Sequence, residues 1–315
     1  MSVRDPVTVL LPTVEWTTAC EQVAGQLRAD DELFVICDRE NDPVANREPS
    51  DGVEILVAGE PDGCAAKANA MAYGMERATN DRIVWSDADY ERNSDWLDSL
   101  VEAGEIHGPA AVLPMFPGDG WSWRLVEPVM VLALGLQTGL FWSDGSGGYP
   151  WGGGVTFRCT ELDVPVEQFA TELRQCISDD NVLHEHVGDA YMLRELPAIV
   201  HVDGDFEDTA RRLIRWMRAD HVRYDLRGRF VGSLLLAALA AVLPFLVAPL
   251  ITIAAGLGYR KLGYSRWTFL LAYHGLFVLP LVFGAGILID EFTWGGRRYR
   301  VNDLYDVEVL GNAPA

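Results

Sequence analysis

The chain has 315 residues and a formal net charge of −21, a length that suits one large domain with an appendage. The charge is uneven: residues 1–228 hold 41 acidic and 18 basic residues, whereas residues 229–315 hold five acidic and seven basic ones. An N-terminal part this acidic excludes nucleic acid as a partner bound through its phosphate backbone.

Short apolar runs alternate with helical patterns through the first half of the chain. The patterns predict helices at 16–28, 63–78 and 94–105, and they predict strands at 6–12, 32–37, 53–58, 82–86 and 110–116. This alternation is typical of an α/β fold, in which helices cover both faces of a mostly parallel sheet. Ligands of such sheets bind beyond the carboxyl ends of the strands.

Two acids, Asp87 and Asp89, follow the apolar run 83–85 just past the end of a predicted strand. In an extended chain residues i and i+2 lie on one face, so the two carboxylates lie roughly 7 Å apart. Like charges this close repel each other unless a cation compensates them. Mg²⁺ or Mn²⁺ binds through one or two carboxylates and takes its other ligands from phosphates and water. A metal site is therefore one interpretation, and a solvated strand end is the other.

The last third of the chain contains two long runs without Asp, Glu, Lys or Arg, at residues 230–259 and 267–289. Because a helix needs about 20 apolar residues to span a bilayer, we expect a two-helix transmembrane hairpin at about 231–257 and 267–289. Helices buried in a soluble core are the alternative.

The hairpin predicts the domain organisation. A catalytic domain at 1–228 precedes the membrane segment at 229–290, and a tail at 291–315 follows it. Arginines are frequent before the first apolar run and after the second, and this bias predicts a multi-pass protein of the cell membrane, with its large domain and both termini in the cytoplasm.

A third apolar run, at 128–142, has 15 residues, which is too few to span a bilayer. Four tryptophans flank or end it: Trp121, Trp123, Trp142 and Trp151. Because tryptophan favours the headgroup level of a membrane, an interfacial helix is one interpretation and a core helix is the other.

A series of short motifs runs in order along the chain. Each contains polar, charged or glycine residues, and the first four lie at the end of a predicted strand or on a predicted helix. They are VTVLLPT, which ends at Thr13; ELFVICDREND, with Asp38 and Asp42; GCAAKANAM, with Lys67; SDADY, with Asp87 and Asp89; WGGGVTFR at 151–158; ISDDNVL, with Asp179 and Asp180; and RRLIRW at 211–216.

This series resembles the family 2 glycosyltransferases of the GT-A fold. Within that family it is most similar to the membrane-bound branch that includes ceramide glucosyltransferases and archaeal glycosyltransferases of lipid-linked glycans. The resemblance covers nearly the whole chain, including WGGRRYRV at 294–301.

The resemblance implies the groups that bind the nucleotide sugar. Asp38 would accept from the uracil ring, with Thr13 nearby on the first strand and Asp42 further along the turn. Lys67 would lie near the diphosphate, and it is notable as the only lysine before residue 261. For Asp38, Asp42 and Lys67 the alternatives are ordinary turn or surface roles.

The resemblance also implies a metal site, a base and an acceptor site. Asp89 would be the direct ligand of Mg²⁺ or Mn²⁺, with Asp87 towards the ribose and sugar. Asp180 would be the catalytic base, although Asp179 and Asp180 can instead cap a helix. Gly153 and Gly154 would lie under the acceptor, where glycine permits close approach to the backbone.

The motif RRLIRW matches the family's (Gln/Arg)-x-x-Arg-Trp at Arg212, Arg215 and Trp216. The two arginines lie at i and i+3 on one helical face, so both can contact phosphate oxygens. The resemblance implies that Trp216 packs on the acceptor. A basic helix on lipid headgroups is the alternative for the arginines.

These assignments predict an inverting, metal-dependent glycosyltransferase that moves a hexose or hexuronate from a nucleotide diphosphate sugar, UDP-linked by preference, to a hydroxyl of a lipid-linked acceptor. Carboxylate-rich, lysine-poor surfaces resemble those of extreme halophiles, in which salt screens self-repulsion. The acceptor would then be a dolichyl-phosphate-linked saccharide for N-glycosylation of a surface-layer protein. The alternatives are a glycolipid synthase of the ceramide-glucosyltransferase type and a non-catalytic membrane scaffold.

Overall fold

A computed structural model describes residues 4–137 and 145–313. The chain divides into two compact units. The first comprises residues 1–115, 145–200 and 305–309, and the second comprises 116–144, 201–304 and 310–315. Each unit is described by itself below.

The first unit is built on a seven-stranded sheet with the order β3-β2-β1-β4-β6-β5-β7. Neighbouring strands are parallel except around β6, which runs antiparallel to both β4 and β5. The prediction of an α/β fold with a mostly parallel sheet is confirmed. The strands are β1 (Val7–Pro12), β2 (Glu32–Cys37), β3 (Val53–Val57), β4 (Arg82–Ser86), β5 (Ala110–Met115), β6 (Gly154–Arg158) and β7 (Tyr191–Ile199).

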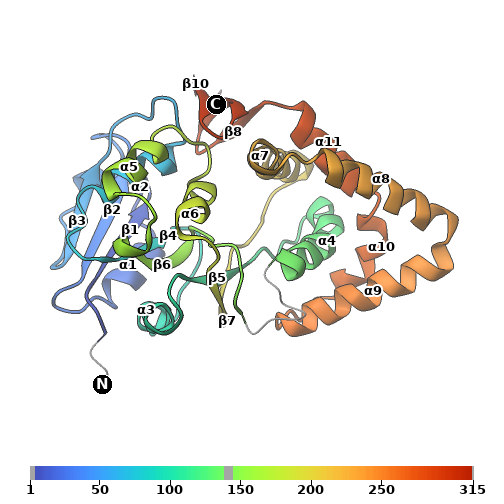
Figure 1. The fold of residues 1–315 in the computed structure, drawn as a ribbon, viewed down its shortest axis with the longest axis horizontal. Coiled ribbons are helices and arrows are strands. Elements are labelled where there is room, and N and C mark those ends of the chain that lie inside the picture. The colour runs from blue at the N-terminus through green and yellow to red at the C-terminus, as the bar shows by residue number, and fades with distance from the viewer. Residues whose placement is uncertain (1–3, 138–144, 314–315) are drawn as a thin grey trace. The chain divides into compact units, whose positions relative to one another are not determined.

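Helices lie on both sides of this sheet (Figure 1). They are α1 (Thr18–Ala24), α2 (Ala66–Met75), α3 (Trp96–His107), α5 (Val166–Leu173) and α6 (Asp179–Val187), with 3-10 turns at Pro43–Asn46 and Cys159–Glu161. The apolar residues of β4 are fully buried, and the Trp85 ring lies 5.6 Å from Phe157 and 6.0 Å from Phe169. This aromatic packing fixes the strand that leads into Asp87.

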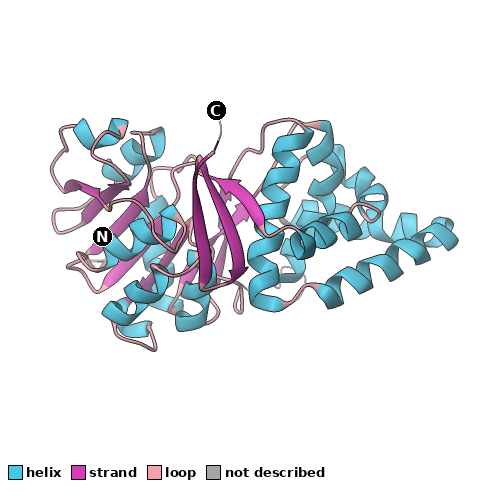
Figure 2. Cartoon of the chain, turned by 90° about the horizontal axis from the view of Figure 1, so that it is seen from above, coloured by secondary structure: helices cyan, strands magenta, loops and turns pink. Residues whose placement is uncertain are grey.

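The second unit is mostly helical, apart from the strands near the C-terminus (Figure 2). Its helices are α4 (Trp121–Gln137), α7 (Phe206–Tyr224), α8 (Arg227–Val242), α9 (Pro244–Lys261), a 3-10 turn at Trp267–Leu271, α10 (Ala272–Gly275) and α11 (Leu279–Leu288). β8 (Glu291–Trp294) and β9 (Arg297–Asp303) form an antiparallel hairpin in this unit. The strand β10 (Asp306–Asn312) follows them and is divided between the two units, since residues 306–309 belong to the first.

Helix α4 covers most of the third apolar run, and residues 138–142 of that run lie outside the described residues. Trp123, Val126 and Val129 on this helix are buried in the core cluster of the second unit. Of these three only Val129 lies within the run, where Val131 is also buried but Leu136 is 60% exposed. The core interpretation therefore holds for the buried side of this helix, and the interfacial interpretation stays a prediction.

Neither of the two long apolar runs is one continuous helix. The first breaks at Leu243, where α8 ends and Pro244 opens α9. A proline disfavours the helical conformation of the residue before it but suits the first position of a new helix. The second run is divided among the 3-10 turn at 267–271, α10 and α11. The expectation of two unbroken helices at 231–257 and 267–289 is wrong.

Within the described ranges no single helix has both the length and the apolar composition to cross a membrane. One pair, Trp267–Gly275 with Leu279–Leu288, meets that test when its two parts are taken together, and it is bent by 64°.

Candidate active site

The acidic motif and the glycine-rich motif meet at one end of the sheet. Strand β6 pairs with β4 so that Gly154 lies opposite Ser86, the last residue of β4. The next residue, Asp87, donates its backbone N–H to the Gly153 carbonyl at 2.9 Å. Two motifs separated by more than 60 positions in the sequence therefore form one edge of a site.

Lys67 lies between two carboxylates from other elements. Its Nζ is 2.7 Å from Asp87 Oδ1 and 3.0 Å from Asp179 Oδ2. Burial alone would lower the pKa of Lys67, but the charges of Asp179 and Asp87 outweigh it and raise that pKa well above its usual range. Lys67 is therefore a permanent cation that ties α2 to the end of β4 and to the start of α6.

Asp180 is the second acid of α6, and its Oδ1 accepts from the Gly152 N–H at 2.9 Å. Burial, and then the negative charge of Asp179, raise the pKa of Asp180 to about 7, against the opposing effect of Lys67. A carboxyl with a raised pKa can take up a proton more readily than an ordinary aspartate. The local environment thus suits Asp180 to proton transfer.

Helix α6 is capped by Ser178, whose Oγ accepts from the Asn181 N–H at 3.4 Å. Because the helix begins at Asp179, the alternative that Asp179 or Asp180 caps it is wrong. Asp179 is only 2% exposed and holds Lys67 instead. The sequence could not distinguish these roles, because all four residues of SDDN are of types that can cap a helix.

Gly152 and Gly153 lie so close to the acids that a larger residue at either position would displace a carboxylate. A Cβ on Gly152 would lie 3.0 Å from Asp179 Oδ2 and closer still to Asp180 Oδ1, and a Cβ on Gly153 would lie 2.5 Å from Asp87 Oδ2. Sequence reasoning named Gly153 and Gly154 but missed Gly152, which is the one that donates to Asp180. The run of three glycines before a strand was the available signal.

Arg92 braces the loop after β4, and sequence reasoning also missed it. Its buried guanidinium lies 3.8 Å from the ring centroid of Tyr90 and 4.8 Å from that of Trp96. It donates hydrogen bonds to the Asp87 carbonyl and to Ser86 Oγ. These contacts fix the backbone that carries the first acid of the pair, and no motif in the sequence indicates them.

Thr13 and Asp38 follow the neighbouring parallel strands β1 and β2, and the Thr13 N–H donates to the Ile36 carbonyl at 2.8 Å. Asp42 Oδ2 accepts from the N–H groups of Asp38 and Arg39 at 3.0 and 2.8 Å. Asp42 thus closes the turn that carries Asp38, as its alternative interpretation expected. Contacts of these three residues with a nucleotide stay a prediction.

The metal prediction depends on Asp87, which is half-buried, and on Asp89, which is exposed. In residues 4–137 and 145–313 no group of three or more His, Cys, Asp or Glu side chains converges as a metal site. Mg²⁺ or Mn²⁺ that takes its remaining ligands from a diphosphate and water needs only one or two carboxylates. The oxygen donors of Asp87 and Asp89 fit a hard cation of this kind.

Arg212 and Arg215 lie on α7 in the second unit. They line a cavity of about 490 Å³, and the Arg215 guanidinium carbon lies 4.7 Å from the ring centroid of Trp294. The motif RRLIRW and the C-terminal WGG are therefore brought together. The other residues that line the cavity are Asp203, Gly204, Asp208, Arg211, Thr293 and Gly295.

Trp216, also on α7, packs against Phe116 and Trp123 with ring centroids 4.9 and 5.9 Å apart, beside the core cluster of its unit. Its contacts in the second unit are therefore those of a packing residue. A contact between Trp216 and an acceptor stays a prediction.

Comparison with known proteins finds a family match over part of the chain. Residues 19–161 match the family described as Glycosyl transferase family 2. This range contains Lys67 and both acids of the motif after β4, and it ends just beyond the glycine-rich strand β6. No curated protein matches the chain.

Several solved structures match the chain at low sequence identity. A mycobacterial protein is 14% identical with a TM-score of 0.39, and the match covers 68% of this chain and 74% of that one. Glucosyl-3-phosphoglycerate synthase from Mycobacterium tuberculosis, in complex with Mn²⁺ and UDP-glucose, is 16% identical with a TM-score of 0.38, and the match covers 63% and 70%. The same enzyme with Mg²⁺ and UDP is 15% identical with a TM-score of 0.36, and the coverage is the same.

Proposed function

Because the chain carries a family 2 glycosyltransferase domain and is a glycosyltransferase, we propose that it moves a hexose or hexuronate from a UDP-linked sugar to a hydroxyl of a lipid-linked acceptor, with inversion at the anomeric carbon. The observation that carries this proposal is the cluster of Lys67, Asp87, Asp179 and Asp180 at the carboxyl end of β4, against the glycines of 152–154. Ligands of α/β sheets bind at such ends.

In this proposal the donor lies across the ends of β1, β2 and β4. Asp38 accepts from the uracil ring, with Thr13 beside it, and Asp42 holds the turn. Asp89 and Asp87 hold Mg²⁺ or Mn²⁺, which when bound neutralises negative charge on the diphosphate. Lys67 supplies a second positive charge near the diphosphate, and the 2.7 Å contact between its Nζ and Asp87 Oδ1 supports this position.

Asp180 is the proposed base. Its carboxylate takes the proton of the acceptor hydroxyl while that oxygen attacks the anomeric carbon from the face opposite the leaving diphosphate. The N–H of Gly152 orients the carboxylate, since it donates to Oδ1 at 2.9 Å. Gly153 and Gly154 are both buried, and Gly154 lies against Val112 and Tyr90, so their contact with the acceptor stays a prediction.

Arg212 and Arg215 are proposed to contact phosphate oxygens of the donor, and Trp216 is proposed to contact the acceptor. Two guanidinium groups lining one cavity support an anionic ligand, because each can donate two parallel hydrogen bonds to a phosphate. The same chemistry suits a phosphate that links a lipid to a saccharide.

The acceptor proposal rests on the apolar character of the second unit. We propose that the protein works at the cytoplasmic face of the cell membrane, on a dolichyl-phosphate-linked saccharide that is destined for N-glycosylation of a surface-layer protein. The acidic, lysine-poor composition supports a halophilic setting.

The proposal is tested by screening UDP- and GDP-sugars for turnover in high salt, with Mg²⁺, with Mn²⁺ and with chelator. Acceptors are then compared as lipid extracts, polyprenyl-phosphate saccharides and ceramide. Metal-dependent transfer to the polyprenyl-linked saccharides is expected. Transfer to ceramide or diacyl lipid instead would make the protein a glycolipid synthase. Failure to bind or hydrolyse any nucleotide sugar would make it a scaffold.

A further inference from the structure

The hairpin of α8 and α9, residues 230–259, exposes an extensive apolar surface and is called the apolar hairpin below. Monomeric soluble proteins rarely expose contiguous apolar patches of more than a few hundred Å². Twelve large apolar side chains of this segment are exposed: Val231, Leu234, Leu235, Leu236, Leu239, Val242, Leu243, Phe245, Leu246, Leu250, Ile253 and Leu257. A surface of this kind requires a partner that is itself apolar.

Helix α8 is apolar around most of its circumference. Within the apolar part of this helix only Ser233 and Ala240, which are seven positions apart on one stripe, are buried, whereas the three consecutive residues 234–236 are all exposed. A helix at a water-exposed surface buries its apolar stripe and presents charged or polar residues on the opposite face. The surroundings that suit α8 are therefore lipid rather than water.

The vertex of the hairpin, residues 242–246, has the sequence VLPFL and carries no polar side chain. Phe245 is 97% exposed there. Turns that emerge into water are rich in Gly, Asn, Asp and Ser, because these residues satisfy or tolerate the turn backbone. A vertex of only apolar residues indicates that the turn ends inside an apolar medium and does not reach water on the far side.

Most of the backbone N–H groups at the vertex have a partner within the protein. In hydrocarbon every peptide N–H and C=O needs a partner. The N–H of Leu243 donates to the Leu239 carbonyl at 2.8 Å, and those of Leu246 and Val247 donate to the Leu243 carbonyl at 3.1 and 3.0 Å. Pro244 has no N–H, and the Ala240 carbonyl accepts from a tyrosine hydroxyl, that of Tyr273, at 3.1 Å.

Basic residues mark the two open ends of the hairpin. Arg227 and Arg229 lie at the start of α8, and Arg260 and Lys261 lie at the end of α9. Carboxylates lie 3.7 and 3.6 Å from the first two, in exposed ion pairs that contribute little. In a chain with a net charge of −21, cations at both ends of an apolar segment are complementary to anionic lipid headgroups.

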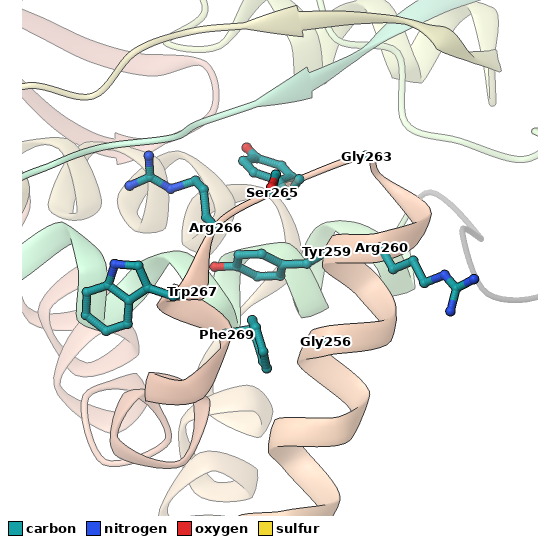
Figure 3. A pocket seen from close by; sticks show the side chains of 9 residues that line it. Gly256, Tyr259, Arg260, Gly263, Ser265, Arg266, Trp267 and Phe269 are labelled. Atoms are coloured by element: carbon teal, nitrogen blue, oxygen red, sulfur yellow. The ribbon is translucent and has the colours of Figure 1, made fainter.

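A preformed cavity lies beside the end of α9. It has a volume of about 530 Å³, and its lining includes Tyr259, Arg260, Ser265 and Trp267 (Figure 3). In Figure 3 the Arg260 side chain extends away from the Tyr259 ring. Aromatic residues that carry a polar atom, together with arginine, are the groups that favour the headgroup level of a bilayer.

The polar network behind this cavity holds it in shape. Glu127, on α4, is 1% exposed and accepts from the Tyr259 hydroxyl at 2.8 Å and from Arg266 Nε at 3.1 Å. Thr268 donates to the same carboxylate oxygen. The end of α9 and the start of the next segment are thereby fixed to α4, so the headgroup level has a defined position on the protein.

We propose that the apolar hairpin inserts into one leaflet of an anionic membrane and does not cross it. The vertex at Phe245 ends among the acyl chains, and the basic ends at Arg229 and Arg260 lie among the headgroups on the same side. Helices of 16 and 18 residues are about 24 and 27 Å long, so both arms lie obliquely in a leaflet about 15 Å deep. The inference rests on the proposed function, because it places the enzyme where a lipid-linked acceptor presents its hydroxyl.

The first experiment is flotation of the purified full chain with vesicles of phosphatidylglycerol and phosphatidylcholine. The wild type is expected to float, and Phe245→Glu is expected to reduce the bound fraction at least tenfold. Phe245 is almost fully exposed, so the substitution removes little packing from the free protein. The matched control is Ile106→Glu on α3, since Ile106 is 66% exposed and lies in the first unit. Equal flotation of the Phe245 variant and the wild type would overturn the proposal.

Lipid charge gives a second test. Replacing phosphatidylglycerol by phosphatidylcholine alone is expected to weaken wild-type binding severalfold, and Arg260→Glu with Lys261→Glu is expected to weaken binding to the anionic vesicles to a similar extent. Binding that is independent of lipid charge would contradict the role of the basic ends. A dimer in the absence of vesicles that Phe245→Glu dissociates, together with no flotation, would show that a second copy of the chain covers this surface instead.

The depth of position 245 in the bilayer distinguishes a hairpin that inserts into one leaflet from one that crosses the membrane. A fluorophore is attached at Phe245→Cys in a Cys159→Ser background, because Cys159 is the one native thiol among the described residues that is not buried. Quenching by lipids with spin labels deep in the acyl chain is expected to exceed quenching by headgroup labels. A quencher trapped inside the vesicle should have no effect. Strong quenching from inside would show that the vertex crosses the bilayer and would overturn the proposal.

Flotation and depth need neither donor nor acceptor, so their failure is separable from failure of the proposed function. A chain that floats but transfers no sugar to any lipid-linked acceptor keeps the membrane inference and loses the function. A chain that transfers sugar but does not float with anionic vesicles loses the inference alone.

Discussion

Replacing Asp180 by Asn tests the proposed base directly. An asparagine Oδ1 can still accept from the Gly152 N–H, which now donates to Asp180 at 2.9 Å, so the shape and orientation of the side chain are kept. The amide cannot take up a proton. We therefore expect transfer to fall by a factor of about 10² to 10⁴, while the affinity for the nucleotide sugar stays within about twofold.

The same variant is also expected to change how the stability of the fold depends on pH. Burial and the charge of Asp179 raise the pKa of Asp180 to about 7, from an ordinary value near 4 in the unfolded chain. Between these values the folded state holds a proton that the unfolded state has released, so the stability of the wild type decreases as the pH rises from about 4 to about 7. The free energy of unfolding of the Asn variant does not decrease in this way, so at pH 8 the variant is more stable than the wild type by at most an amount on the order of 4 kcal/mol.

Two measurements check the argument. Urea unfolding of both proteins at pH 5 and at pH 8 in high salt, without metal, gives the stability difference, and transfer with saturating donor gives the activity. Asp179→Asn is the control, because it breaks the buried pair with Lys67. That change is expected to destabilise the fold by about 3 kcal/mol and to reduce transfer less than Asp180→Asn does. Wild-type transfer by Asp180→Asn would remove Asp180 from the mechanism.

Three further changes give expected outcomes of other kinds. Asp89→Ala should abolish turnover and weaken donor binding in Mn²⁺ without loss of fold, and donor binding that responds neither to this change nor to chelator would disprove the metal role. Gly152→Ala should lower transfer at least tenfold, because the new Cβ would overlap Asp180 Oδ1; normal kinetics would show that the backbone gives way. Burial lowers the pKa of His186, but hydrogen bonds to the carboxylates of Asp163 and Glu172 outweigh burial and leave this pKa raised. The protonated His186 therefore stabilises the folded state fully below pH 6.5, and this contribution is lost as the pH rises above the raised pKa. His186→Gln should therefore reduce the melting temperature more at pH 5.5 than at pH 9, and an equal reduction at both would contradict the ion pairs.

The first five strands of the first unit could be predicted from the sequence because their apolar runs are local, whereas β6 and β7 were not among the predicted strands. The strands 82–86 and 32–37 are centred on the apolar runs 83–85 and 33–37, and both appear in the structure at the predicted bounds. The same pattern places Asp87 just beyond the end of β4, because the apolar run stops before it. Ligand sites of parallel sheets lie at such strand ends, so the sequence also indicated where the site lies.

Tertiary structure decided which distant residues share the site. Lys67 lies on α2, Asp87 follows β4 and Asp179 opens α6, and only the packing of these elements brings the Lys67 ammonium within 3.0 Å of both carboxylates. Gly152 acquired its contact with Asp180 in the same way. No local pattern contains such information, because an ion pair between elements depends on how their backbones pack.

The apolar run at 230–259 also separates what the sequence determined from what the structure decided. By itself the sequence determined that this segment avoids water, because it has no charged residue over thirty positions. Only the structure decided that the run is two helices that meet at Leu243, and that most of α8 is left uncovered by the rest of its unit. The physical reason is that composition sets the preferred solvent of a segment, whereas a single proline and the packing of neighbouring helices set its path.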